Sequence, residues 1–192
     1  MGRRKSLTKE ELFQATGQVI RSDGIHGVHF KKLSEILGVG RSTLYEYYRN
    51  KEELLIAYLR EIMDEMNQRI ENIPAEIQPN EKLRSLLFIL LDHAQIHQVE
   101  RMIREIQTSE EELASYYQSQ LAGEHKKTYE VLVKWINDAK AGGIWSAKVD
   151  TEIIADIIFH AILFPHKHKV GPQEMAEQLM LLIEHGAAVS KT

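Results

Sequence analysis

Apolar residues recur along this chain at spacings of three and four, which is the period of an amphipathic helix. The first such segment has one apolar face, formed by Leu12, Ala15, Val19 and Ile20. Just before it, Thr8 and Glu11 have the spacing of a capping box, in which each side chain accepts a hydrogen bond from the other residue's backbone N–H. The pattern predicts a helix that starts at Thr8 and stops at Gly24, since glycine commonly ends helices.

The same period continues to the C-terminal end of the sequence. A short helix is expected to end at Gly38, a third to span 41–48, and a long one to run from Asn50 to about residue 73. Pro74 and Pro79 bracket a linker. Beyond it, apolar periodicity predicts helices over roughly 80–97, 99–107, 109–141, 150–164 and 172–189. The predicted fold class is all-α.

Two short helices joined by a glycine-containing turn, Gly38-Val39-Gly40, are typical of a DNA-binding helix-turn-helix. We expect a small core to set the crossing of the two helices, made of Leu33, Ile36, Leu37, Val39 and Leu44. This core would point a set of polar and aromatic side chains outward, namely Arg41, Ser42, Thr43, Tyr45 and Tyr47. Guanidinium, hydroxyl and phenol groups can bond to base edges or to phosphates, which an apolar helix could not do.

The motif around these helices resembles the signature of the TetR family of bacterial regulators. The resemblance covers about residues 8–60 and is densest in the run Gly27-Val28-His29-Phe30-Lys31-Lys32-Leu33-Ser34-Glu35-Ile36-Leu37-Gly38-Val39-Gly40-Arg41-Ser42-Thr43-Leu44-Tyr45-Glu46-Tyr47-Tyr48-Arg49-Asn50-Lys51-Glu52-Glu53-Leu54. It includes Gly-Val, Thr-Leu-Tyr, an aromatic pair and a Lys-Glu-x-Leu helix start. Phe30 departs from the pattern, because a threonine that reaches a phosphate is common there.

The resemblance implies a three-helix DNA-binding head over residues 1–50 and a helical effector-binding and dimerisation domain over residues 51–192. It also implies a ligand-responsive transcriptional regulator, a repressor that a small-molecule effector releases from a palindromic operator. Its partners would be double-stranded DNA, an unidentified small molecule, and a second copy bound through residues 150–189. The expected DNA contacts are Lys31, Lys32, Arg41, Ser42, Thr43, Tyr45, Tyr47 and Lys51. No cofactor, metal or membrane is expected.

The charge distribution agrees with a DNA-facing head. The chain has a net charge of −4, yet residues 1–60 carry 11 lysines and arginines against 7 acidic residues. The head is therefore basic and the remainder acidic, which favours nucleic acid as the partner of the head. Cysteine is absent, which rules out disulfides and thiolate metal sites and suits a cytoplasmic protein. The longest apolar stretches are too short to span a bilayer.

Residues about 60–140 are the expected site of an effector cavity, because methionine and aromatic side chains gather there with a few polar groups. The candidates are Met63, Met66, Phe88, His93, His97, Met102, Tyr116, Tyr117 and Trp135. Side chains of these types at helical spacing are more often ordinary core. The i, i+4 pair His93 and His97 is open to three interpretations: a pocket wall, a metal site lacking a clear third ligand, or plain structure.

Several candidates in the head have a second explanation. Tyr45 and Tyr47 would otherwise be packing residues, and Lys51 an ordinary surface lysine. Arg3, Arg4 and Lys5 form either a disordered tail or a basic arm that reaches the minor groove.

The apolar helices at 150–164 and 172–189 would otherwise be buried within one monomer. An enzyme on a helical scaffold is the chief rival function, but no catalytic motif supports it, so we expect no catalysis. A helical adaptor at a membrane surface is the other rival.

Overall fold

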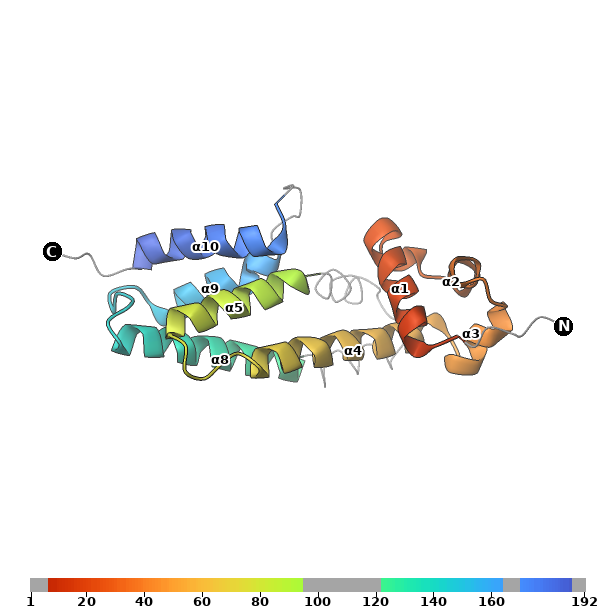
Figure 1. The fold of residues 1–192 in the computed structure, drawn as a ribbon, viewed down its shortest axis with the longest axis horizontal. Coiled ribbons are helices and arrows are strands. Elements are labelled where there is room, and N and C mark those ends of the chain that lie inside the picture. The colour runs from red at the N-terminus through yellow and green to blue at the C-terminus, as the bar shows by residue number, and fades with distance from the viewer. Residues whose placement is uncertain (1–6, 95–121, 164–169, 188–192) are drawn as a thin grey trace. The chain divides into compact units, whose positions relative to one another are not determined.

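The computed structural model describes residues 7–94, 122–163 and 170–187, and these are almost entirely helical, which confirms the all-α prediction. Figure 1 shows the order of the elements. They are α1 (Lys9–Asp23), the 3-10 helix η1 (Ile25–Gly27), α2 (Phe30–Leu37), α3 (Arg41–Tyr47), α4 (Lys51–Glu71), α5 (Pro79–Asp92), α8 (Ala122–Ala141), α9 (Thr151–His160), the 3-10 helix η3 (Ala161–Leu163) and α10 (Pro172–Ala187).

The described residues belong to two compact units. The N-terminal unit contains residues 7–63, and the C-terminal unit contains residues 64–94, 122–163 and 170–187. The boundary between Met63 and Asp64 falls inside α4, so this helix contributes to both units. A functional boundary after residue 50 stays a prediction.

The helices of the N-terminal unit begin and end where local side-chain chemistry dictates. Thr8 and Glu11 form the predicted capping box, with both N···O distances at 3.1 Å. Asn50 caps α4, because its Oδ1 accepts a 2.8 Å hydrogen bond from the Glu53 N–H. Gly38 ends α2 with a φ of 66°, in the left-handed region that glycine adopts without strain.

The core of the N-terminal unit joins all four of its α-helices. Leu12, Leu33, Leu44 and Leu54 have no exposed surface, and they come from α1, α2, α3 and α4. Ile36, expected in this core, is instead 42% exposed. The packed face of α2 follows Phe30, Leu33, Ser34 and Leu37 at helical spacing, so Ile36 lies beside that face.

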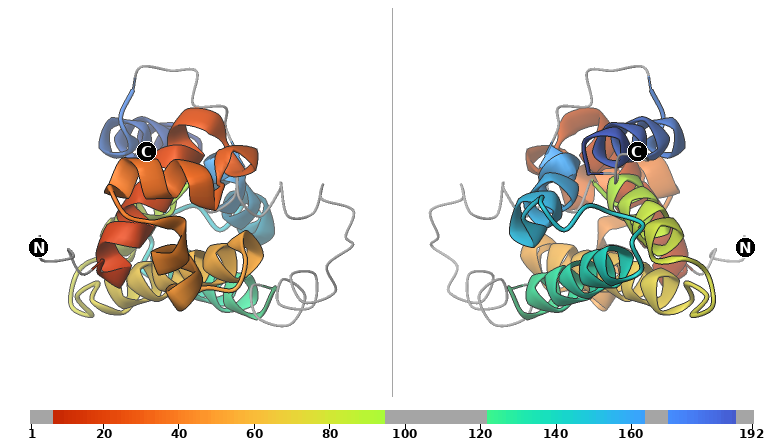
Figure 2. Two further views of the ribbon diagram at one scale, coloured as in Figure 1. Left: turned by 90° about the vertical axis from the view of Figure 1, so that its right-hand side faces the viewer. Right: turned by 90° about the vertical axis from the view of Figure 1, so that its left-hand side faces the viewer.

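The C-terminal unit is organised around α5. This helix packs against α10, α8 and α9, and α8 also packs against α9. Viewed along their length in the right-hand panel of Figure 2, these four helices surround a common interior. The buried side chains Leu83, Leu87, Ile136 and Met180 are part of that interior.

Two helices of the C-terminal unit end earlier than their apolar pattern suggests. The segment predicted over 80–97 ends as α5 at Asp92; the next residue, His93, caps the helix and has its ring Nδ1 2.8 Å from the Ile89 carbonyl oxygen. The segment predicted over 150–164 is α-helical only to His160 and then tightens into η3. No helix in the described part of the chain is long and apolar enough to cross a membrane.

Large apolar side chains that remain exposed in the described residues gather in two places. Ile36, Tyr45 and Tyr47 lie on α2 and α3. The others lie on α9, η3 and α10: Ile153, Ile157, Leu163, Leu181 and Leu182. Leu182 on α10 is 70% exposed, because the packed face of that helix runs through Met175, Ala176, Met180 and Ile183.

Candidate nucleic-acid interface

The turn between α2 and α3 positions the second helix of the motif. The N–H of Gly38 and the N–H of Val39 both bond back to the Ser34 carbonyl, which closes the end of α2. Gly40 precedes α3 in an extended conformation, and its carbonyl accepts from the Thr43 N–H at 3.0 Å. Leu44, which has no exposed surface, then anchors α3 to the core and leaves the rest of the helix outside.

The outward side of α3 carries the predicted polar residues. Arg41, Ser42 and Tyr45 are exposed, and Thr43 is half-buried. Glu46, which the sequence analysis did not single out, is also exposed, one turn after Ser42 and beside Tyr45. Its position relative to Ser42 was the available signal, since residues i and i+4 share a helix face.

Tyr45 makes an aromatic contact with a buried ring of α2. Its ring lies edge-to-face on Phe30 of α2, with 4.8 Å between centroids, and Phe30 is buried. This contact limits the rotamers of Tyr45 while 58% of its surface stays exposed. Phe30 therefore supports the α3 surface from within, although it cannot donate a hydrogen bond to a phosphate.

Tyr47 has a structural partner. Its hydroxyl donates to the Leu7 carbonyl, 40 residues away in the sequence, so it ties the end of α3 to the segment before α1. The ring is still partly exposed. Its neighbour Tyr48 stacks on Phe13 at 6.4 Å between centroids, and burial raises the pKa of the Tyr48 phenol.

The predicted lysine contacts differ in their surroundings. Lys31 is exposed, whereas the Lys32 ammonium is 2.8 Å from Asp23 Oδ2, an ion pair that joins α2 to the end of α1. The hydrogen bond from Lys32 also lowers the pKa of Asp23. A phosphate would have to compete with Asp23 for Lys32.

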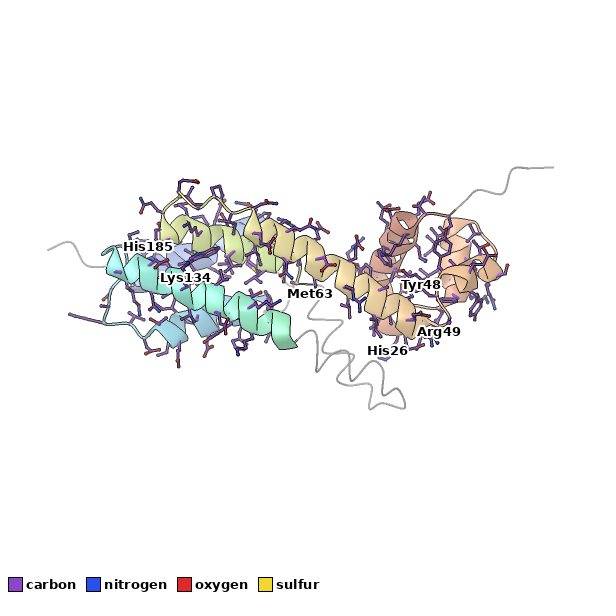
Figure 3. The ribbon with its side chains drawn as sticks, turned by 90° about the horizontal axis from the view of Figure 1, so that it is seen from below. His26, Tyr48, Arg49, Met63, Lys134 and His185 are labelled. Atoms are coloured by element: carbon purple, nitrogen blue, oxygen red, sulfur yellow. The ribbon has the colours of Figure 1, made fainter. Side chains whose placement is uncertain are left out.

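Lys51 lies at the first position of α4, half-buried, with its ammonium 3.5 Å from Glu52 Oε1. The residues just before it are braced by Glu53, whose carboxylate accepts hydrogen bonds from the Arg49 backbone N–H at 2.7 Å and from the Arg49 guanidinium at 3.3 Å. Those bonds lower the pKa of Glu53, the backbone bond most. Figure 3 labels Tyr48 and Arg49 beside the first turns of α4.

Gly17 lies in the middle of α1, and only the tertiary structure explains why a glycine stands there. A Cβ at this position would lie 2.7 Å from the Tyr58 hydroxyl oxygen of α4. Gly17 thus allows α1 and α4 to approach at the buried Tyr58 ring, which also packs edge-to-face on Phe13.

The candidate effector residues do not come together at one described cavity. Met63, Met66 and His93 are buried, Trp135 is half-buried, and His97, Met102, Tyr116 and Tyr117 lie outside the described residues. Arg3, Arg4 and Lys5 lie outside them too. His93 Nε2 is 3.9 Å from Glu65 Oε1, and no group of three metal-ligating side chains occurs among the residues described.

Two hollows open on the C-terminal unit. One, of about 500 Å³, lies between α4 and α8 and is lined by Asp64, Gln68, Glu71, Thr128 and four neighbours. The other, of about 350 Å³, includes Phe88 in its lining and lies among the end of α4, α5 and the start of α10.

The family model for bacterial regulatory proteins of the tetR family matches residues 12–58, which span α1, α2, α3 and the start of α4. Residues 12–58 of this chain are therefore a TetR-family domain. In TetR terms the described α2 and α3 are the helix-turn-helix, and the sequence-based recognition is confirmed.

Curated relatives match this chain over its N-terminal part. The fatty acid metabolism regulator protein of Bacillus subtilis is 32% identical over 74 residues, which is 38% of this chain and 38% of the relative. The chain therefore aligns with well under two thirds of that relative's length.

Solved structures resemble the whole chain in fold. The ketosteroid transcriptional regulator KstR2 of Mycobacterium tuberculosis has a TM-score of 0.75 at 15% identity, covering 98% of this chain and 100% of its own. A regulator from Saccharomonospora viridis in complex with choline has a TM-score of 0.72 at 16% identity, covering 94% and 97%. At these identities the likeness concerns the fold.

Proposed function

We propose that this chain is a DNA-binding transcriptional repressor that acts as a homodimer in the cytoplasm and leaves a palindromic operator when a small-molecule effector binds. The observation that carries the proposal is α3: a buried Leu44 and a closed turn hold the helix, while Arg41, Ser42 and Tyr45 remain exposed. In helix-turn-helix proteins the second helix enters the major groove with its N-terminal residues at the base edges.

Each exposed group on α3 suits a particular DNA contact. The Arg41 guanidinium can donate two hydrogen bonds to guanine, and Ser42 and Thr43 can bond to bases or phosphates. Tyr45 presents a hydroxyl on a ring that Phe30 holds in place. Glu46 would accept from a cytosine amino group, the acceptor contact that glutamate makes in the major groove.

Phosphate contacts fall to the flanking helices. We assign them to Lys31, which is exposed, and to Lys51. The acidic neighbour of Lys51 is Glu52, whose Oε1 lies 3.5 Å from the Lys51 ammonium. Lys32 contributes less, because Asp23 holds its ammonium at 2.8 Å. Tyr47 acts by fixing the end of α3 to Leu7.

The exposed aliphatic face of α9 and α10 favours a second copy as its occupant. Ile153, Ile157, Leu181 and Leu182 are each about half exposed or more, and a set of aliphatic side chains this large is rarely left in water without a partner. A two-fold dimer would present two α3 helices to half-sites about 34–36 Å apart, or multiples of that distance, along the DNA.

The effector would bind in the C-terminal unit. The α4/α8 hollow is of a size that suits a small molecule, and it lies within the segment where we expect the effector. A structural neighbour was solved with choline, and other relatives carry names from fatty acid and ketosteroid metabolism, so their names point to no shared ligand class. Release from DNA requires that the effector bind the DNA-incompetent state more tightly.

The decisive experiment selects DNA. Genomic fragments retained by the pure protein are sequenced, and binding to the recovered sequence is compared with random DNA across a salt series. We expect a near-palindromic site and an affinity that falls linearly with salt on logarithmic axes. Equal affinity for all duplexes, or preference for anionic vesicles over DNA, would overturn the proposal.

A further inference from the structure

The smaller hollow of the C-terminal unit has a composition unlike the other. It lies where the end of α4, the middle of α5 and the first turn of α10 meet, and its volume is about 350 Å³. Two guanidinium groups line it, those of Arg69 and Arg84, and none of its lining residues is acidic. By contrast, the α4/α8 hollow has Asp64 and Glu71 in its lining.

Carboxylates orient both guanidinium groups without using all of their N–H donors. Arg69 Nη1 donates to Asp92 Oδ2 at 2.6 Å, and Arg84 Nη2 donates to Glu184 Oε1 at 3.0 Å with Nε 3.6 Å from Glu81 Oε2. Each guanidinium carries five N–H bonds, so both keep donors beyond these contacts. Acids outside the hollow thus hold the two side chains in place while their remaining donors stay available to an occupant.

One wall of the hollow is apolar. The Phe88 ring lies under Arg69, with the guanidinium carbon 5.4 Å from the ring centroid, and Ile89 is its neighbour on α5. Asn72, Ser85 and Gln173 supply neutral polar groups around it. Gln173 belongs to the first turn of α10, the end of a helix that carries partial positive charge.

We propose that this hollow is a binding site for a small organic oxyanion, a carboxylate or phosphate monoester with a short apolar group. A guanidinium group can donate two parallel hydrogen bonds to the oxygens of such a group, which lysine cannot do. The apolar part would rest on Phe88 and Ile89. The volume is near the lower end of the range for small-molecule sites, which limits the occupant to a small metabolite.

An occupant of this site would contact three helices of the C-terminal unit at once. Arg69 is on α4, the helix whose first residue is Lys51; Arg84 is on α5; and Gln173 is on α10, which carries Leu181 and Leu182. Occupancy would therefore alter DNA affinity, a consequence that rests on the proposed function. The binding itself does not depend on it.

Isothermal titration of the full chain with hexanoate, hexyl phosphate and inorganic phosphate tests the site. We expect at least one hexyl anion to bind and Arg69→Gln and Arg84→Gln each to weaken it about tenfold or more, since each removes a charge-assisted contact. Lys134→Gln is the matched control: it removes one positive charge from an exposed position of the same unit, on α8 (Figure 3). Equal weakening in the control, or no binding of either hexyl anion, would overturn the proposal.

Phe88→Leu keeps both arginines and tests the apolar wall even if a glutamine variant fails to fold. It should weaken hexanoate or hexyl phosphate while sparing inorganic phosphate; unchanged binding of the hexyl anions would contradict the assignment. DNA affinity is measured in parallel. Anion binding without any operator binding would contradict the proposed repressor function but support this site. Operator binding without anion binding would support the repressor function and contradict this site.

Discussion

The N-terminal and C-terminal units both leave large apolar side chains exposed, yet the two sets differ in chemistry. On α2 and α3 the set contains two tyrosines, Tyr45 and Tyr47, and one aliphatic residue, Ile36. On α9, η3 and α10 every member is isoleucine or leucine. The first set lies on helices that also expose Arg41 and Ser42, whereas the side chains of the second set carry no polar atom.

This difference separates two kinds of partner. A tyrosine offers a large contact area together with a hydroxyl, which suits a wet and charged surface such as DNA. Leucine and isoleucine offer only area, which is useful where water is fully excluded, as in a homodimer interface. The two exposed surfaces thus indicate a polar partner for the head and an apolar, self-complementary partner for the body.

Leu182→Asp should have the largest effect, because it places a charge in the aliphatic surface. We expect light scattering to fall from about twice 22.2 kDa to one copy, and operator affinity to collapse with it. Ala147→Asp, in the exposed loop between α8 and α9, is the control and should remain dimeric. A dimer that survives Leu182→Asp would show that the exposed aliphatic side chains of α10 are not the dimer interface.

Gly17→Ala tests whether the head is set by tight packing. Its Cβ would meet the Tyr58 hydroxyl at 2.7 Å, and overpacking of this kind costs about 1–3 kcal/mol. In a Tyr58→Phe background the oxygen is gone, so the same substitution should gain up to about 1 kcal/mol of helix propensity. Chemical denaturation of the four chains gives the coupling; strictly additive effects would show that the contact is absent.

Arg41→Ala and Lys51→Ala separate base reading from phosphate binding within the head. Loss of a two-bond contact to guanine should cost about 1–3 kcal/mol and relax preference at one base pair. Lys51→Ala should weaken operator and random DNA alike and lower the salt slope by about one. Binding of both variants to operator variants across a salt series checks this, and a collapse of the operator-to-random ratio in Lys51→Ala alone would reverse the roles.

Tyr45→Phe and Tyr47→Phe test which of the two tyrosine hydroxyls contacts DNA and which stabilises the fold. The Tyr47 hydroxyl donates to the Leu7 carbonyl, so its removal should cost about 0.5–1.5 kcal/mol of stability. Tyr45 has its hydroxyl on an exposed ring, so its removal should lower DNA affinity and leave the free energy of unfolding nearly unchanged. The opposite pattern in thermal unfolding and DNA titration would mean that Tyr47 reads the DNA.

The Asp23–Lys32 pair should give the smallest effect, a pH dependence of stability. The pKa of Asp23 is lowered in the folded chain, first by the hydrogen bond from Lys32, so the stabilisation is present above the unfolded pKa near 4 and is lost as pH falls through the folded value. The difference in unfolding midpoint between the native chain and Asp23→Asn should therefore shrink below about pH 4. Lys32→Gln should reduce the same dependence and leave the part that the Ser22 hydrogen bond causes; a constant difference down to pH 2 would contradict the pairing.

Much of the fold was predictable from short-range patterns. The capping box at Thr8 and Glu11, the Asn50 cap and the Gly38 stop all formed as expected, because each depends on residues within four positions. The exposure of Arg41, Ser42 and Tyr45 followed from the same helical period. Burial at the edge of a helix was less predictable, as Ile36 shows.

The contacts that the sequence did not reveal join residues far apart in the chain. Gly17 and Tyr58, Tyr47 and Leu7, and Arg84 and Glu184 meet only after the helices have packed. Helical periodicity shows which side of a helix is apolar but not which neighbour will cover it or at what angle. The sequence by itself therefore determined the helices, the helix-turn-helix and the family, while the tertiary structure decided which lysine is paired, why Gly17 is needed, and that Arg69 and Arg84 share one hollow.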